Sequence, residues 1–157
     1  MSAHIISYEQ ACEMRNLHNL DIKSMPIFKE ADENGLCELL ASTSSFPNSI
    51  EILVKDDLDV KNAIGYVITV YKDSIDIWVA YEIDGNIHAG LSVCKNLNIN
   101  TSLAECIAKA KNEINICPVC RKEVQYKDQH MYSFAGRCCI DCLPAMKKEH
   151  EYPGWYN

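Results

Sequence analysis

The sequence predicts an α+β fold: an antiparallel three-stranded meander with helices, followed by a C-terminal module that binds zinc through four cysteines. Three observations predict it. Apolar residues alternate along three consecutive runs, apolar residues recur at helical spacing beside those runs, and five of the nine cysteines gather between Cys117 and Cys142. We expect an acidic body over residues 1–115 and the zinc module over residues 116–157.

The first expected helix covers about residues 8–20. Ser7 and Gln10 have the spacing of a helix capping box, in which each side chain satisfies a free backbone N–H group. The region 26–42 opens with Pro26, which suits a first helical turn, but an Asn-Gly pair interrupts its pattern. The pattern is compatible with either of two structures for this region: one helix, or two short elements.

Three strands are expected near residues 64–72, 75–83 and 87–94. In each of them apolar or tyrosine side chains alternate with other residues, as in a strand with one buried face. Turn-forming residues at 72–74 and 84–86 separate the runs. Such short connections predict antiparallel neighbours, and hence the meander.

A helix over about residues 102–114 is expected to cover one face of the meander. Ser102 and Glu105 form a second capping-box pattern, and apolar residues follow at helical spacing. The helix leads almost directly into Cys117, without a spacer rich in Gly, Ser or Pro. The body and the module are therefore expected to pack on each other.

Four cysteines of the module have the spacing of a zinc site. Cys117 and Cys120 form one C-x2-C pair. Cys139 and Cys142 form a second pair, and 18 residues separate the two pairs. Four thiolates complete the tetrahedral coordination of Zn²⁺ and leave no position for water, so the expected cofactor is one structural Zn²⁺. Reduced thiols without a metal are the alternative.

The order of local elements expected in the module resembles treble-clef zinc fingers. A knuckle at 117–120 is followed by a hairpin from 123–126 and 131–134, and the second cysteine pair leads into a helix. The matching stretches are CPVC, YSFAGRCCIDCLP and the helix after them, over about residues 116–152. This C-terminal part is also similar to small uncharacterised proteins of Gram-positive bacteria and their phages. The resemblance implies a zinc-binding domain without an established activity.

The knuckle departs from the family pattern at one position. Arg121 follows Cys120, where many knuckles have a glycine that adopts a positive φ angle. The departure puts the knuckle geometry in doubt rather than the set of ligands.

A surplus cysteine leaves alternatives open. Cys138 can replace Cys139 as a ligand, act as a reactive thiol beside the cationic Arg137, or pack inward as an ordinary buried residue. His130 and His150 are further candidate ligands, although four cysteines already complete the coordination.

The charge is unevenly distributed along the chain. Residues 1–116 hold 9 Lys and Arg against 17 Asp and Glu, a net charge of -8, whereas residues 117–157 hold 6 against 5, a net charge of +1. An acidic body favours basic partners over phosphate backbones. We therefore expect a protein partner whose basic surface meets Asp56, Asp57 and Asp59. A solvated loop or helix start is the other interpretation of this acidic run.

Nucleic-acid binding through the zinc module is the alternative function. Six basic residues lie in the module: Arg121, Lys122, Lys127, Arg137, Lys147 and Lys148. The five acidic residues of the same segment interrupt any basic stripe of the kind that phosphate binding needs.

Catalysis is the third hypothesis, with a site in the acidic body. The sequence contains no G-x-S-x-G, H-E-x-x-H, P-loop or Rossmann glycine pattern. Trp78 and His88 are expected on one face of the meander, where they either line a pocket or are a packed tryptophan and a partly exposed histidine. The expected function is thus a non-enzymatic, zinc-containing adaptor or inhibitor that binds protein, and the resemblance to phage proteins suggests a host protein as its target.

The expected location is the cytoplasm. No run approaches the roughly 18 consecutive apolar residues that span a bilayer, and the first ten residues lack a basic segment followed by an apolar one. Thiols stay reduced in the cytoplasm, which suits a cysteine cluster that binds a metal.

Overall fold

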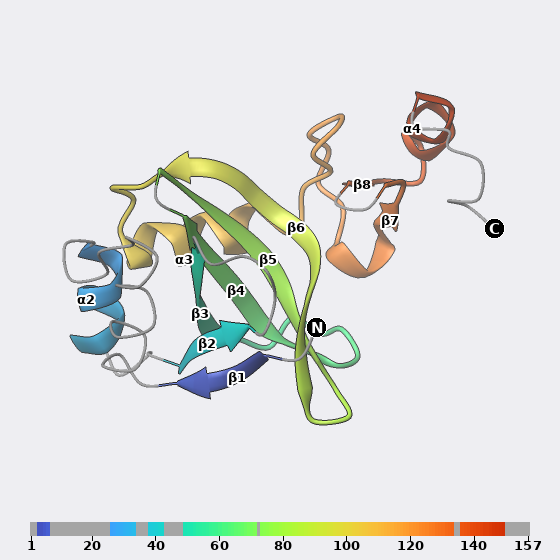
Figure 1. Ribbon diagram of the computed structural model, residues 1–157. Coiled ribbons are helices and arrows are strands. Elements are labelled where there is room, and N and C mark those ends of the chain that lie inside the picture. The colour runs from blue at the N-terminus through green and yellow to red at the C-terminus, as the bar shows by residue number, and fades with distance from the viewer. Residues whose placement is uncertain are drawn as a thin grey trace.

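Six antiparallel strands of the described part of the chain close into a barrel (Figure 1). The computed structural model describes residues 3–6, 26–33, 38–42, 49–71, 73–133 and 136–149. The barrel strands follow one another in space as they do in the chain: β1 (Ala3–Ile6), β2 (Glu38–Ser42), β3 (Ser49–Lys55), β4 (Ala63–Tyr71), β5 (Ser74–Ile83) and β6 (Asn86–Asn98). Ala3 of β1 pairs with Ile87 of β6 and closes the ring.

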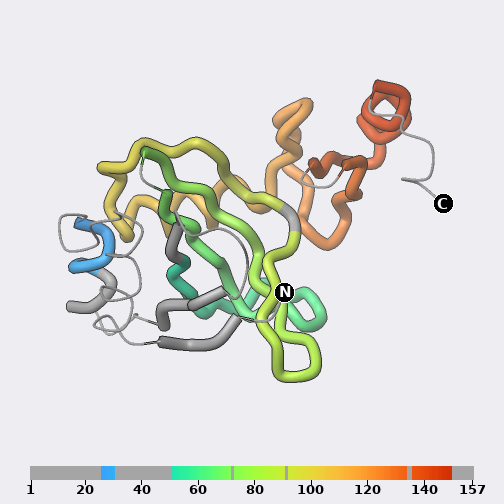
Figure 2. Tube along the Cα trace, in the orientation of Figure 1, coloured from blue at the N-terminus to red at the C-terminus, as the bar shows by residue number. Residues whose placement is uncertain are grey.

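Helices and a two-stranded ladder accompany the barrel. They are α2 (Pro26–Glu33), α3 (Leu103–Glu113), the 3-10 turn η2 (Tyr126–Asp128), β7 (His130–Met131), β8 (Arg137–Cys138) and α4 (Leu143–Glu149). The trace runs from α2, at one side of the barrel, through the strands to β7, β8 and α4 at the other side (Figure 2). We call the described residues between 116 and 149 the cysteine segment. Among the described residues, no helix combines the length and the apolar character needed to cross a bilayer.

The sheet contains the three predicted strands, but the prediction of its size is wrong. β4, β5 and β6 correspond to the predicted meander, and β1, β2 and β3 enlarge it to a closed barrel. β1 has four residues and β2 has five, which is too short for an alternating pattern to stand out in the sequence. β6 also runs to Asn98, beyond its predicted end at residue 94, and register shifts interrupt its pairing with β5.

The helical predictions have three different outcomes. The helix expected at 102–114 is present as α3. The region 26–42 forms two elements, because α2 begins at Pro26 and β2 follows it. The helix expected at 8–20 lies outside the described residues.

The core lies between one face of the sheet and the two helices α2 and α3. Ile75, Ile77 and Val79 of β5 are fully buried in it, together with Phe28 of α2 and Cys106 of α3. Each large apolar side chain that is buried in this way contributes about 1.5–3 kcal/mol relative to an exposed one. Because side chains alternate along a strand, the opposite face carries a separate cluster, built on Leu53, Val67 and Ala80.

A carboxylate from α2 completes the N-terminal cap of α3. Ser102 accepts a hydrogen bond from the Glu105 N–H at 3.1 Å, which is half of the predicted capping box. Glu30 accepts from the N–H groups of Leu103 and Ala104 at 2.8 and 3.1 Å. These N–H groups have no partner within the helix, so the two side chains satisfy the start of α3 and hold α2 against it.

A glycine permits a sharp irregularity where β4 passes β3. Gly65 has φ +144, and a Cβ atom at this position would lie 2.0 Å from the carbonyl oxygen of Val54. The pairing of β4 with β5 shifts register between Ala63 and Gly65. Only a residue without a side chain allows the two backbones to approach this closely.

Candidate metal centre

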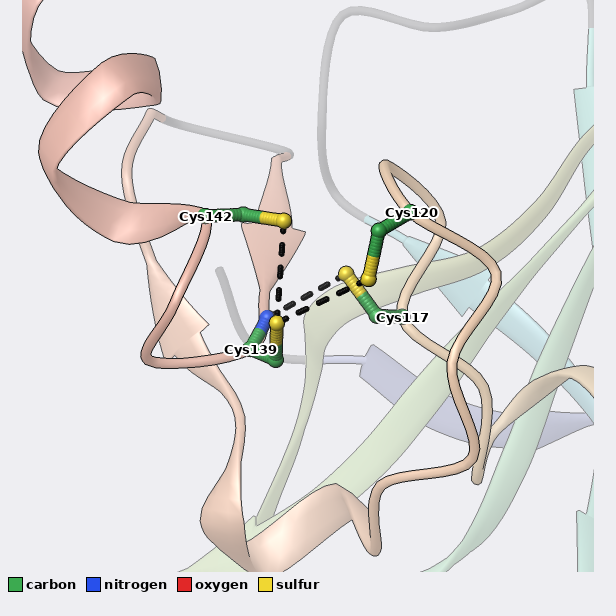
Figure 3. A group of neighbouring side chains, drawn as sticks. All are labelled: Cys117, Cys120, Cys139 and Cys142. Carbon is green, nitrogen blue, oxygen red and sulfur yellow. Dashed lines mark hydrogen bonds between the residues drawn. The ribbon is translucent and has the colours of Figure 1, made fainter.

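The structure brings the four predicted ligands together (Figure 3). Their sulfur atoms all lie within 4.8 Å of one another and point into a common space. The Cys139 Sγ atom lies 3.7 Å from Cys120 Sγ and 3.6 Å from Cys142 Sγ. Zn–S bonds of about 2.3 Å would place tetrahedral sulfur atoms about 3.8 Å apart. Two of the sulfur separations therefore match those around a single tetrahedral ion, and all four sulfur atoms are close enough to share one.

The first cysteine pair lies on a tight knuckle. The Arg121 N–H donates to the Cys117 carbonyl at 2.8 Å, and the Cys117 N–H donates to the Lys122 carbonyl at 2.8 Å. Arg121 has φ 65, the left-handed conformation that glycine often supplies at this point of a knuckle. The knuckle thus forms despite the arginine, at a cost in backbone strain.

The second cysteine pair lies in the turn that leads into α4. The Cys142 N–H donates to the Cys139 carbonyl at 3.1 Å, and the Met146 N–H donates to the Cys142 carbonyl at 3.1 Å. α4 begins at Leu143, directly after the last cysteine. The predicted knuckle and the predicted helix after the second cysteine pair are present, but the described residues do not form the predicted hairpin of 123–126 with 131–134. Residues 126–128 form the 3-10 turn η2, and the ladder pairs β7 with β8.

Backbone N–H groups tune the first sulfur. Burial raises the pKa of Cys117, but hydrogen bonds from the backbone N–H groups of Cys120, Cys139 and Val119 outweigh it and lower this pKa to about 6. The N–H group of Cys139 lies 3.2 Å from the Cys117 sulfur. The arrangement therefore favours a thiolate at Cys117, the form that binds metals.

The last sulfur has the opposite tendency. The pKa of Cys142 is raised by desolvation and by hydrogen bonds with the three neighbouring thiols. Four negative sulfur atoms at such short distances repel one another, so they do not all ionise unless a cation joins them. A divalent metal would supply that cation and release the remaining protons.

Cys138 lies outside the four-sulfur group. It is fully buried in β8, and burial together with the charges of Cys117 and Cys139 raises its pKa to about 11. This environment matches the inward-packed alternative rather than a ligand or a reactive thiol. His130 is exposed on β7 and is not part of the group. His150 lies outside the described residues.

Arg137 is the residue at this site whose role the sequence did not reveal. Only 2% of its surface is exposed. Its Nε atom donates to the Ser92 carbonyl of β6 at 2.8 Å, and one terminal nitrogen donates to the Glu113 carbonyl at the end of α3 at 3.0 Å. The other terminal nitrogen donates to the Ile116 carbonyl at 3.0 Å and to the Gln129 side chain. The only signal in the sequence was a charged residue directly before a cysteine pair.

Two further contacts join the cysteine segment to the rest of the chain, one at β5 and one at the end of α3. The Tyr126 hydroxyl lies 2.8 Å from the Tyr81 hydroxyl, and Tyr126 belongs to the main core cluster. The Gln129 amide donates to the carbonyls of Ile114 and Val124, both at 2.9 Å. The two predicted units therefore contact each other across the predicted boundary at 115/116. Whether they are separate domains stays a prediction.

The other candidate residues do not gather at the cysteine cluster. Trp78 packs against the apolar cluster of Leu53, Val67 and Ala80, on the face of the sheet opposite to the main core. The Lys95 ammonium lies 5.3 Å from the centroid of the Trp78 ring. His88 pairs with Tyr81, which packs on the main core. Because residues 78 and 81 of β5 face opposite ways, the expectation that Trp78 and His88 share a face is wrong.

The acidic run forms a loop between β3 and β4. The Asp57 N–H donates to the Asp56 carboxylate at 2.9 Å, and the Asp59 N–H donates to the Asp57 carboxylate at 3.0 Å. The run is thus the solvated loop that one of the two interpretations expected. Its carboxylates help to order their own backbone.

Two of the basic residues are paired with acids on the surface. Arg121 donates two hydrogen bonds, of 2.7 and 2.8 Å, to the carboxylate of Glu113. Lys122 lies 3.4 Å from a carboxylate oxygen of Asp141. Together with the burial of Arg137, these pairs reduce the positive charge that the cysteine segment presents to a partner.

Comparison with known proteins adds no assignment. The chain matches no protein-family model, no curated protein and no solved structure. The four sulfur atoms, close enough to bind one metal ion together, are the feature from which a function can be argued.

Proposed function

We propose that this chain is a zinc protein in which Cys117, Cys120, Cys139 and Cys142 hold one structural Zn²⁺. The observation that carries the proposal is the convergence of four sulfur atoms within 4.8 Å of one another. Four thiolates fill the tetrahedral coordination of the ion, so no position remains for a reacting water. The ion would fix the knuckle to the start of α4, in a segment that has only two short strands and one short helix of its own.

Zinc is the metal that this donor set favours. Thiolates are soft ligands, and a tetrahedral arrangement of four sulfurs selects zinc or iron among the common metals. We propose a treble-clef arrangement for the segment, supported by the knuckle at Cys117, the β7–β8 ladder and the position of α4 after Cys142. In that arrangement zinc has a purely structural role.

Metal analysis of the purified full-length chain tests this proposal. We expect one zinc per chain by mass spectrometry, and tetrahedral thiolate absorption when Co²⁺ replaces zinc. Stoichiometric iron would keep the site but change the metal. A metal content near zero, in protein purified under reducing conditions without chelator, would leave the four cysteines as reduced thiols and refute the proposal.

We propose further that the chain binds a protein, as an adaptor or an inhibitor. Two exposed apolar side chains support this role. Val119 lies between the cysteines of the first pair and is 41% exposed, and Ile140 lies between those of the second pair and is 59% exposed. Exposed apolar residues on the two loops that the metal would join suit a protein surface better than a phosphate backbone. The resemblance to phage proteins suggests a host protein as the target.

Nucleic-acid binding receives less support from the same surface. Arg137 is buried, Arg121 is paired with Glu113, and Lys122 lies near Asp141. Phosphate binding needs several free cations along one track. The acidic body, with the exposed Asp57 and Asp59 in one loop, would repel such a ligand.

Pull-down with nuclease treatment separates the two functions. Wild-type protein is compared with a Val119→Ser, Ile140→Ser double variant, whose zinc content is measured first. We expect wild-type protein to capture a protein partner that stays bound after nuclease treatment. The double variant should not capture this partner, although its zinc content is unchanged. Association that slows with rising salt would also support a basic partner surface facing the acidic loop. Capture that nuclease abolishes would favour nucleic acid.

A further inference from the structure

The side chain of Arg137 lies between the two chain segments that the metal would join. Its guanidinium donates to the carbonyl of Ile116, which directly precedes Cys117. Two residues after Arg137, the Cys139 N–H donates to the Cys117 sulfur. The arginine and the metal would thus join the same two segments at neighbouring points.

The same guanidinium also joins these segments to the barrel. It donates to the carbonyl of Ser92 at 2.8 Å and to that of Val93 at 3.4 Å, both on β6. It donates to the carbonyls of Glu113 and Ile114, at 3.0 and 3.5 Å, where α3 ends. The last carbonyls of a helix lack partners within it and carry partial negative charge, so a cation at this place is favourable.

Burial makes the hydrogen bonds of the Arg137 guanidinium sensitive to small displacements of the side chain. Arg137 is almost completely buried, and every hydrogen bond that the structure gives it ends on a carbonyl oxygen or on the Gln129 amide oxygen rather than on a carboxylate. A buried cation held by carbonyl dipoles is stable only while all of these acceptors surround it. A small displacement of β8 would take the guanidinium away from several acceptors at once.

A cavity lies beside the contact between the cysteine segment and the barrel. It has a volume of about 270 Å³ and is lined by residues of β6, the knuckle and the β7–β8 connection, among them Ser92, Pro118, Tyr132 and Arg137. Water can therefore reach the contact between the cysteine segment and the barrel from this cavity.

We infer that metal binding at the four cysteines and docking of the cysteine segment on the barrel are coupled through Arg137. The inference rests on the proposed metal site. With the metal bound, Cys117 and Cys139 hold the 116–117 and 137–139 stretches in the geometry that the guanidinium needs. Without it, the 116–117 and 137–139 stretches move away from the barrel while Tyr126 stays in the core, Arg137 regains water, and the end of α3 together with the middle of β6 becomes exposed. The metal content of the chain thereby decides whether this surface is covered, and by linkage Arg137 raises the affinity for the metal.

Hydrogen–deuterium exchange of the wild-type chain tests the first half of the coupling. Metal-loaded protein is compared with protein freed of metal by a chelator under reducing conditions. We expect exchange to become at least about tenfold faster, after metal removal, in peptides that cover 92–94 and 113–117, while β4 keeps its protection. Unchanged protection of these peptides in metal-free protein would overturn the inference, and this experiment needs no variant that has to fold.

The affinity for Zn²⁺ tests the second half. Arg137→Lys keeps the charge but loses the planar fork that reaches several carbonyls, and we expect its zinc affinity to fall by about 10–100-fold, as for other residues that support metal ligands. Lys127→Arg is the control: it exchanges an exposed basic side chain of the same segment and keeps the charge, and we expect a change of less than about threefold. Competition with a chromophoric chelator gives both values.

The outcomes separate this inference from the proposed function. If wild-type protein binds one zinc and Arg137→Lys binds zinc as tightly as the wild-type protein and Lys127→Arg do, the metal site stands and the coupling through Arg137 is wrong. If wild-type protein binds no zinc, the proposed function fails and the coupling fails with it.

Discussion

The hydroxyl groups of Tyr81 and Tyr126 lie 2.8 Å apart and join a strand of the barrel to the segment that carries the cysteines. Tyr126 is only 7% exposed and packs in the main core cluster. A buried hydroxyl that loses its partner costs more than the hydrogen bond itself contributes. The pair is therefore a fixed point of contact between the two parts of the chain, separate from the contacts of Arg137.

Removal of either hydroxyl should lower the stability of the whole chain. We expect Tyr81→Phe and Tyr126→Phe each to reduce the free energy of unfolding by about 1 kcal/mol. The double variant should lose less than the sum of the two, because its second substitution removes a hydroxyl that has already lost this hydrogen bond. Urea unfolding of the four proteins measures these values. Strictly additive losses would mean that the two hydroxyls do not interact.

The two neighbouring cysteines should respond very differently to substitution. Cys139→Ser removes one of the four converging sulfurs, so we expect loss of bound zinc and loss of ordered structure in the cysteine segment. Cys138→Ser should keep one zinc per chain and lose only a modest part of its stability, because Cys138 is a packed side chain. Zinc content and thermal unfolding measure both. Equal loss of zinc from the two variants would show that the ligand set is wrong.

Two glycines with positive φ angles provide a matched test of the β3–β4 contact. Gly65→Ala should destabilise the barrel by several kcal/mol, because its Cβ would meet the Val54 carbonyl oxygen at 2.0 Å. Gly85→Ala, in the β5–β6 turn with φ +79, meets nothing within 4 Å and should cost only about 1–2 kcal/mol of backbone strain. Denaturant midpoints compare them. Equal costs would mean that β3 can move away from Gly65.

The buried phenol and thiol of the core should make the fold sensitive to alkali. Burial, followed by the negative charges of Asp56 and Cys94, raises the pKa of Tyr66 to about 12. Burial, followed by the charge of Cys94, raises that of Cys106 to about 12 as well. Both groups bind their protons more tightly in the folded chain. In the unfolded chain the pKa is about 10 for Tyr66 and about 8.5 for Cys106. The contribution of each group to stability is therefore complete below its unfolded pKa, and is lost as pH rises towards about 12.

The double variant Tyr66→Phe, Cys106→Ala isolates this effect. We expect the free energy of unfolding of the wild-type chain to fall between about pH 8 and pH 11, and the slope to be smaller in the variant, whatever its stability at neutral pH. Urea unfolding at several pH values gives the slopes. Identical slopes would show that these two groups do not govern the alkaline loss of stability.

Prediction from sequence succeeded where a pattern is long and local. β4 and β5 have nine and ten residues, so alternation identified them, and the spacing of Ser102 and Glu105 located the start of α3. The convergence of the four cysteines followed from two C-x2-C pairs, because each pair is formed by a local turn. The sequence left the backbone of Arg121 in doubt, and the structure shows that the knuckle adopts the left-handed conformation there without a glycine.

Prediction failed where a role depends on distant segments. β1 and β2 are too short to show a period, and closure of the barrel depends on one pairing between Ala3 and Ile87. Arg137 belongs to a residue type that is mostly found on protein surfaces. Its burial is possible only because β6, α3 and the knuckle bring their carbonyls to one point, which no local pattern encodes.

Closure of the barrel between Ala3 and Ile87 also constrains the order of folding. During synthesis the ring cannot close until β6 has left the ribosome, because its first strand waits for a partner more than eighty residues away. Contacts between residues so far apart in the sequence form slowly. The cysteines emerge later still, within a span of 26 residues from Cys117 to Cys142. Slow ring closure would thus be followed by a fast, local step that consumes one metal ion, and scarcity of that ion would stall the chain only at its final stage.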